Sequence, residues 1–285
     1  MGASAPCDLG RMNHGVMRRL NSSLLLRAYC AGLFPMADTR DADDVFWVEP
    51  RRRGILPLDG FHLPRSMLKV LRQERYLNSC DRAFEAVIAH CAEAAPGRQQ
   101  TWINPIIREA YVRLHHEGHA HSIEAWTPEG ELVGGLYGVR VGAAFFGESM
   151  FSRATDASKA ALAHLVVRLR MGGFQLLDTQ FLTTHLARFG GQEVRRSHYV
   201  GLLNEAVAAS ADWTALDRYP TGVDDTIGAC GSGATAAGGG DAGGADRGAG
   251  AAARARRGED LPEAAATGGF GPSGKVIAQL LSQIS

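Results

Sequence analysis

Apolar and polar positions repeat most regularly in the middle of the chain. Residues 105–117 place apolar side chains at helical spacing and predict a helix, with Pro105 in its first turn and Gly118 just past its end. Alternation of apolar and polar positions then predicts three strands, over residues 121–126, 132–141 and 143–151. The segments between these strands are short, so we expect an antiparallel meander.

The pattern after the meander changes to a helix and back to a strand. An apolar stripe at helical spacing predicts the helix: Leu162, Leu165, Val166 and Leu169. Thr155 or Asp156 can cap its start, and Gly172-Gly173 ends it. Residues 174–181 predict a strand, which the crossover helix should place parallel to its partner. We therefore predict an α+β (mixed α/β) fold, in which a βαβ unit follows the meander.

The chain divides by pattern into five parts. Residues 1–22 show no clear period and predict a loose extension, and residues 23–62 predict a small N-terminal domain. Residues 63–218 hold the larger domain. Gly and Ala dominate residues 219–273, which cannot bury enough apolar surface to fold and are expected to be disordered. Residues 274–285 regain apolar side chains and are expected to dock as a helix or a strand.

Short elements fill the first half of the chain. Helical spacing predicts helices over residues 24–32, 66–74 and 84–91. Short apolar runs predict strands over residues 45–48 and 55–58, of which the second is the weaker.

The charge of the chain is balanced overall but unevenly spread. With 285 residues, a net charge of +0 and 45% hydrophobic residues, the chain can form one large domain or two modest ones. Lys and Arg exceed Asp and Glu between Arg51 and Arg82. This local excess suits an anionic partner such as RNA, although a solvated helix face would give the same pattern.

Cysteine and histidine positions bear on metal sites and on the compartment. The number of cysteines is odd and none form a Cys-x-x-Cys pair: Cys7, Cys30, Cys80, Cys91 and Cys230. This argues for a reducing compartment and against a disulfide scaffold or a thiolate zinc site. His115 and His119 are one helical turn apart and could chelate a metal, but Gly118 is expected to end the helix between them. We therefore expect structural or surface histidines and no metal.

The N-terminal residues lack the pattern of a signal peptide, because charged residues interrupt them. No apolar run approaches the length of a membrane span. We expect a cytoplasmic protein.

Glu148 is the clearest candidate for chemistry, because it lies among large apolar residues. Strand alternation would put Phe146, Glu148 and Met150 on one face, and Phe145, Ser149 and Phe151 on the other. A carboxylate in such a place is costly unless a cation or hydrogen-bond donors meet it. Glu148 is therefore either paired internally or available to a charged ligand.

Asp178 and Gln180 form a second polar pair, in an otherwise apolar strand. Two strand residues on one face have Cα atoms roughly 7 Å apart, so their side chains can hydrogen-bond if they lean together. The aspartate would then orient the amide and make its oxygen a better acceptor. A satisfied polar pair at a strand end is the alternative.

Short motifs in order along the chain, from about Leu24 to about Asn204, together resemble one family. They are Gly32-Leu33-Phe34-Pro35, Phe46-Trp47, Pro50-Arg51, residues 62–67, Thr101-Trp102-Ile103, Glu109-Ala110-Tyr111, residues 114–115 and 118–124, residues 132–139, residues 147–152 and Asp178-x-Gln180. The chain resembles the leucyl/phenylalanyl-tRNA–protein transferases. The Gly/Ala tract lies outside the resemblance.

This resemblance implies an enzyme that moves leucine or phenylalanine from its tRNA to the α-amine of proteins that begin with Arg or Lys, and we allow methionine as a third donor. The product would carry a degradation signal. The family has a catalytic domain similar to acyl-CoA N-acyltransferases, behind a small N-terminal domain. We expect a monomer without a cofactor, whose partners are Leu-tRNA or Phe-tRNA and the acceptor protein.

Motif positions also carry over the family's site residues. The catalytic residues would be Glu148, Asp178 and Gln180. The residues around the aminoacyl and adenosine groups would be Trp47, Trp102, Tyr111, Phe145, Leu169 and Leu177. The tRNA backbone would be met by Arg51, Arg52, Arg53, Arg65, Lys69 and Arg72. Leu169 and Leu177 stand where the family usually has Phe and Ile, which keeps the pocket apolar.

The expected chemistry suits these residues. The donor ester is already activated, so its aminolysis needs positioning and a proton acceptor more than a covalent nucleophile or a metal. We expect Gln180, held by Asp178, to accept a hydrogen bond from the attacking amine, and Glu148 to hold a cationic amine. On this basis Glu148→Ala and Asp178→Ala should each lower transfer sharply without unfolding the protein.

Two other interpretations remain open at this point. The architecture of an acyl-CoA N-acyltransferase would fit, but Ser152-Arg153-Ala154-Thr155 stands where a Gly-rich pyrophosphate turn would be needed. A non-catalytic tRNA-binding protein would bind tRNA without transfer, and the intact set of Glu148, Asp178 and Gln180 argues against it.

Overall fold

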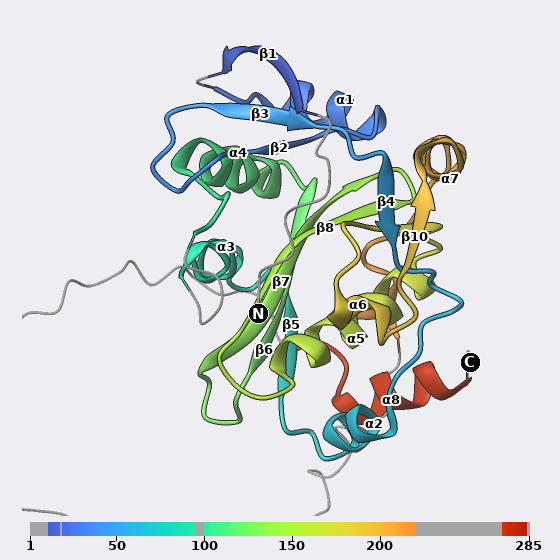
Figure 1. The fold of residues 1–285 in the computed structure, drawn as a ribbon. Helices are drawn as coiled ribbons and strands as arrows, with labels where there is room; N and C mark the ends of the chain where they lie inside the picture. The colour runs from blue at the N-terminus through green and yellow to red at the C-terminus, as the bar shows by residue number, and fades with distance from the viewer. Residues whose placement is uncertain (1–10, 18, 95–99, 220–269, 284–285) are drawn as a thin grey trace, which may run out of the picture. The chain divides into compact units, whose positions relative to one another are not determined.

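The structure, a computed structural model, describes residues 11–17, 19–94, 100–219 and 270–283, and its main element is a seven-stranded sheet (Figure 1). The strands are β4 (Arg52–Ile55), β5 (Leu77–Cys80), β6 (Ala120–Trp126), β7 (Leu132–Val141), β8 (Ala144–Ser152), β9 (Leu176–Gln180) and β10 (Gln192–Arg195). Their order is β10–β4–β9–β8–β7–β6–β5. β8 and β9 run parallel, and the other neighbours are antiparallel. The predicted meander, the parallel strand and the mixed α/β class are confirmed.

Two hydrophobic clusters cover the two faces of this sheet. The first contains side chains of α2 (Arg65–Arg72), α5 (Ala157–Met171), α6 (Thr184–Ala187), η1 (Ala215–Arg218) and α8 (Gly274–Gln283). The second contains side chains of α1 (Ser22–Cys30), α3 (Phe84–Ala92), α4 (Pro105–His116) and α7 (Arg196–Ala208). Phe145 and Phe146 are neighbours on β8 and belong to different clusters, as the alternation of a strand requires.

The starts of two central helices follow from their sequences. Asn104 accepts a hydrogen bond from the backbone N–H of Ile107, and Pro105 occupies the first turn of α4. Asp156 precedes α5, but its side chain binds Lys159 at 2.6 Å and makes no cap hydrogen bond. The predicted start of this helix is therefore right, and the predicted capping bond is absent.

The N-terminal region is more ordered than its sequence predicts. Residues 11–17 form β1 (Arg11–Met17), which pairs with β3 (Val45–Val48) in a three-stranded sheet completed by β2 (Phe34–Met36). The prediction of a loose extension over residues 1–22 is thus wrong for β1. The predicted strand at 55–58 also lies earlier, as β4, and belongs to the main sheet, so the sheet begins before the boundary expected at residue 62. Both strands form because they pair with strands that are distant in the sequence, and such pairing leaves no local pattern.

A β-bulge in β8 overturns the predicted assignment of its faces. Tyr137 and Gly138 of β7 pair with Ser149 and Gly147, so Glu148 is the extra residue. Beyond the bulge the alternation is reversed. Phe146 lies in the cluster with α1 and α4, whereas Met150 packs against the cluster with α5.

The last described segment is helical, which decides between the two forms expected for residues 274–285. Ile277, Ala278, Leu280 and Leu281 of α8 are buried against the first cluster, next to α2 and α5. The segment predicted to be disordered, residues 219–273, lies outside the described residues from 220 to 269. Within the described ranges no helix is both long and apolar enough to cross a bilayer.

Candidate active site

Glu148 is surrounded by three hydrogen-bond donors. Its Oε1 accepts hydrogen bonds from the Tyr29 hydroxyl at 2.7 Å and from Gln180 Nε2 at 2.8 Å. Its Oε2 accepts one from the Tyr111 hydroxyl at 3.0 Å, and the two hydroxyls also contact each other. Tyr29 belongs to α1 and Tyr111 to α4, so two separate helices place their hydroxyls over the bulge. All three donors are neutral, so none of them balances the negative charge of an ionised Glu148.

Burial changes the acidity of this group. Loss of water raises the pKa of Glu148 to about 7, against the effect of its three hydrogen bonds, and the charge of Asp178 adds to the rise. Near neutral pH the carboxyl group is therefore divided between its protonated and ionised forms. A bound cation would favour the ionised form. Burial, and then the charge of Glu148, also raises the pKa of Tyr29 and of Tyr111, so both hydroxyls stay protonated.

Asp178 is fully buried and faces a cation. Arg53 Nε lies 2.9 Å from its Oδ1, and an Arg53 terminal nitrogen lies 2.7 Å from its Oδ2. Oδ2 also accepts a hydrogen bond from the Tyr199 hydroxyl at 2.6 Å. The fork of a guanidinium matches a carboxylate in this geometry, so Asp178 is held as an ion.

Gln180 is positioned by its backbone. Its N–H donates to Asp178 Oδ1 at 2.7 Å, and its φ of 62° is left-handed, which is uncommon for a residue other than Gly. Its amide nitrogen points to Glu148, which leaves its carbonyl oxygen as the acceptor. The sequence allowed a hydrogen bond between the side chains of Asp178 and Gln180. The aspartate instead holds the Gln180 backbone, because the left-handed residue turns its side chain towards Glu148 on β8.

A cavity of about 890 Å³ opens beside these groups. Glu148 and Gln180 line it together with a mostly apolar wall. The apolar wall consists of Met36, Trp102, Leu136, Met150, Phe151, Leu162, Leu165, Leu177, Phe181 and Leu186. A carboxyl group and an amide at the edge of an apolar cavity can hold an apolar group and, next to it, a polar or cationic one.

Comparison with known proteins identifies the family. Residues 55–204 match the family described as leucyl/phenylalanyl-tRNA protein transferase, and residues 18–51 match its N-terminal domain. This chain belongs to that family. The transferase of Rhizorhabdus wittichii is 60% identical over 195 residues, which are 68% of this chain and 78% of that protein. The transferase of Paramagnetospirillum magneticum is 57% identical over 205 residues, which are 72% of this chain and 96% of that protein.

Family membership makes the chain an aminoacyltransferase that moves aminoacyl residues from tRNA to proteins. Among solved structures, L-PGS from Bacillus licheniformis aligns over 55% of this chain and 64% of that one, with 11% identity and a TM-score of 0.37. That likeness is too low to support an argument.

Two of the six residues that the transferase resemblance assigns to the pocket line the cavity. Trp102 and Leu177 do so directly. Tyr111 does not line it, but its hydroxyl donates a hydrogen bond to Glu148, which does. Trp47, Phe145 and Leu169 are buried in the hydrophobic clusters and do not line this cavity, so their assignment stays a prediction. Phe145 instead stacks on Trp213, with the two ring centroids 5.3 Å apart.

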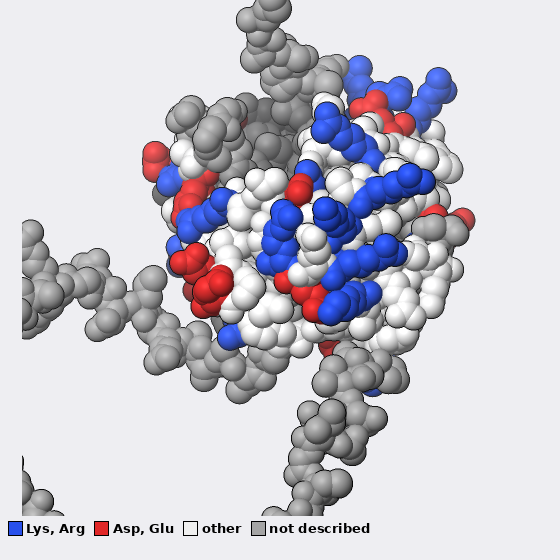
Figure 2. Space-filling view, turned by 90° about the horizontal axis from the view of Figure 1, so that it is seen from below, with Lys and Arg blue, Asp and Glu red and all other residues white. Residues whose placement is uncertain are grey.

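The basic run divides into one buried and several exposed arginines. Arg53 was expected to meet the tRNA backbone, but its side chain is only 1% exposed and pairs with Asp178, so this assignment is wrong. Arg51 and Arg52 are exposed, and Arg52 pairs with Glu193. Arg65, Lys69 and Arg72 are exposed on α2. Figure 2 shows Lys and Arg gathering on the face seen from below, the side on which Figure 1 places α2 and α8.

Sequence reasoning did not find Tyr29 and Tyr199 of this candidate site, and it gave Arg53 a different role. Tyr29 and Tyr199 each occur once on a helix among apolar residues and give no local signal of a function. Arg53 is hidden in a run of three arginines. The one available signal was the position of Arg53 in a short strand, next to Gly54. Neighbouring residues of a strand face opposite sides, so Arg52 and Arg53 cannot both face the solvent.

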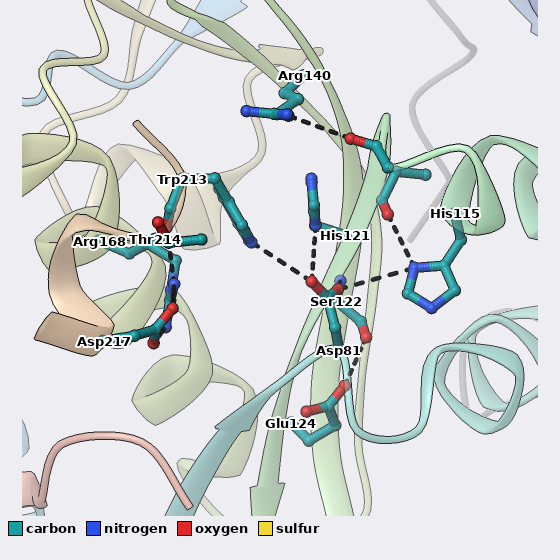
Figure 3. A network of polar contacts seen from close by, with 12 residues as sticks. Asp81, His115, His121, Ser122, Glu124, Arg140, Arg168, Trp213, Thr214 and Asp217 are labelled. Carbon is teal, nitrogen blue, oxygen red and sulfur yellow. Dashed lines mark hydrogen bonds and ion pairs between the residues drawn. The ribbon is translucent and has the colours of Figure 1, made fainter. Parts of the chain in front are cut away.

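His115 and His121 belong to a separate network of polar contacts and do not line this cavity (Figure 3). His121 Nδ1 lies 2.7 Å from Asp81 Oδ2, and His115 Nδ1 lies 2.9 Å from the Ala120 carbonyl oxygen. Trp213 stacks on His121 at 4.2 Å. Among the described residues no group of three or more His, Cys, Asp and Glu could hold a metal ion.

Proposed function

We propose that this enzyme transfers leucine or phenylalanine, with methionine as a weaker donor, from tRNA to the α-amine of proteins that begin with Arg or Lys. The product would be marked for degradation. The observation that supports this proposal is the apolar cavity whose edge carries Glu148 and Gln180. An apolar donor side chain fits the wall, and a reacting amine fits the edge.

The reaction is an aminolysis of an ester. The acceptor α-amine, with a reference pKa of roughly 7.7–8.0, is partly neutral near pH 7. Its nitrogen attacks the aminoacyl carbonyl carbon, the new C–N bond forms, and the bond to the ribose oxygen breaks. The amine loses one proton and the ribose oxygen gains one, so the step is balanced without a further reagent.

The residues divide this work between them. Gln180 presents its carbonyl oxygen to an N–H of the attacking amine and orients the nitrogen. An amide is a weak base, so the proton passes on to the ribose oxygen directly or through water. Ionised Glu148 holds a cationic amine at the edge of the cavity. Asp178 fixes Gln180 and does not contact the substrate.

The test is transfer of radiolabelled leucine from Leu-tRNA to a protein with N-terminal arginine, without ATP or added metal. We expect incorporation that is lost when the α-amine is blocked. Equal incorporation into a protein that begins with Glu would contradict the acceptor part of the proposal. Binding of tRNA without incorporation would favour a binding protein.

The cavity wall should set the donor preference. Met150 lines the cavity and is partly exposed, so Met150→Ala widens the cavity with little effect on the core. We expect kcat/KM for Phe relative to Leu to rise by up to about tenfold, as for a change of one or two methylenes in an apolar pocket. Met171→Ala, outside this cavity, is the control, and an equal change in both variants would contradict the assignment.

The basic face of α2 should bind the tRNA backbone. In Lys69→Glu/Arg72→Glu the two exposed cations become anions, and we expect KM for Leu-tRNA to rise at least about tenfold with kcat little changed. The slope of log KM against log salt should also become shallower. Arg108→Glu is the control, since Arg108 is exposed on α4, on the other face of the sheet. An equal loss in the control would point to net charge alone.

A further inference from the structure

We propose that Arg53 is a positioning residue for aminoacyl transfer, which holds Gln180 in its reactive conformation through the Asp178 carboxylate. This inference rests on the role of Gln180 in the proposed function. Arg53 belongs to a basic run that the sequence analysis assigned to tRNA binding, and this inference gives it a role inside the site instead.

Arg53 is held from every side. Nε and one terminal nitrogen bind Asp178, and the other terminal nitrogen donates to the Gly32 carbonyl oxygen at 2.9 Å. The rings of Phe34 and Tyr199 lie 4.7 Å and 4.8 Å from the guanidinium carbon. All three guanidinium nitrogens are therefore hydrogen-bonded, and two aromatic rings lie against the guanidinium. These contacts hold the Arg53 side chain in one conformation.

The backbone around Arg53 is built for this approach. Gly54 pairs with Gln180 across β4 and β9, and a Cβ at Gly54 would lie 2.7 Å from the backbone of Phe181 and of Leu182. Only Gly allows β4 to come this close to the chain just after Gln180. The strand that carries Arg53 is therefore seated directly against the left-handed residue.

Asp178 transmits this constraint to Gln180. Its Oδ1 binds both Arg53 Nε and the Gln180 backbone N–H, at 2.9 Å and 2.7 Å. The carboxylate can hold the uncommon left-handed backbone of Gln180 only while it is itself fixed and ionised. Arg53 supplies the charge for this, and Tyr199 supplies one further hydrogen bond.

The same ion pair acts on the acidity of Glu148. The charge of Asp178 raises the pKa of Glu148, and Arg53 balances that charge. The other groups facing Glu148 are Tyr29, Tyr111 and Gln180, which are neutral donors. Weakening the pair between Arg53 and Asp178 should therefore make Glu148 ionise at higher pH. A purely structural contact elsewhere would not produce this shift.

The test compares Arg53→Lys and Arg53→Met with Arg108→Gln, a change at an exposed arginine of α4 outside the cavity. Lysine keeps the charge and loses the fork, so Arg53→Lys should fold and lose about 10- to 100-fold in kcat while KM for Leu-tRNA changes little. The acidic limb of its pH profile should move to higher pH, because the weaker pair leaves more of the Asp178 charge acting on Glu148. Arg53→Met, if it folds, should lose at least as much kcat. Arg108→Gln should keep the wild-type kcat and pH profile.

A kcat and pH profile of Arg53→Lys equal to those of wild type would overturn the proposal, as would a loss confined to KM. The ionisation of Glu148 is also followed directly, by carboxyl NMR of protein labelled at Glu. An unchanged midpoint in Arg53→Lys would overturn it as well. If wild-type protein gave no transfer, the proposed function would fail, whereas a shifted midpoint would still show the link from Arg53 to Glu148.

Discussion

Glu148→Gln is expected to abolish measurable transfer and, at the same time, to stabilise the protein above pH 7. Gln cannot hold a cationic amine by charge, so we expect kcat/KM to fall by at least about a hundredfold. The gain in stability follows from the pKa. Burial raises the pKa of Glu148 from 4.5 to about 7, so the folded protein keeps a proton there that the unfolded chain has lost.

The sign of the pH effect follows from this difference. Below about pH 4.5 Glu148 is protonated in both states and adds no cost. As the pH rises from 4.5 to about 7 the free energy of unfolding falls, and above that range the cost is complete, at about 3 kcal/mol. Glu148→Gln removes this cost, so its advantage over wild type should be absent at pH 4 and full at pH 8.

Urea unfolding at several pH values and single-turnover transfer together check this prediction. Glu124→Gln is the matched control, because Glu124 is also buried, burial also raises its pKa, and it lies outside the cavity. The control should gain stability at high pH and keep transfer. Normal transfer in Glu148→Gln would remove Glu148 from the mechanism, and a pH-independent stability difference would contradict the buried acid.

Asp178→Ala should cost the fold as well as the activity. From the sequence alone this change is expected to lower transfer without unfolding the protein. Arg53 is buried against Asp178, so removal of the Asp178 carboxylate leaves the buried Arg53 cation without a partner. This costs about 3–5 kcal/mol of folding stability. The Tyr199 hydroxyl and the Gln180 N–H lose their acceptor in the same step.

The double variant Arg53→Met/Asp178→Leu separates the two effects. It removes both charges, so we expect it to regain much of the stability that Asp178→Ala loses and to remain inactive, because nothing then holds Gln180. Denaturant midpoints and transfer rates measure this. Asp59→Ala serves as the control at a fully exposed carboxylate and should change stability little. Wild-type stability in Asp178→Ala would refute the buried ion pair.

Much of the fold could be predicted from local pattern. The period of two along residues 132–141 predicts β7 with its observed bounds, and the stripe on residues 162–169 predicts α5. The parallel pairing of β8 and β9 followed from chain geometry, because a crossover helix brings the next strand back in the same direction. The motif around Glu148 pointed to the residue that the cavity presents.

The sequence by itself determined the order of the elements from α4 to β9, the family and the central carboxyl group, because each depends on spacing within a short stretch of chain. The tertiary structure decided which side chains face that carboxyl group. Tyr29 meets Glu148 across 119 positions, and Arg53 meets Asp178 across 125. A single extra residue at the bulge puts Met150 on the face opposite to Phe146, and Arg53 is buried on β4, which pairs with β9. Burial and charge partners arise from contacts between distant segments, which no local period contains.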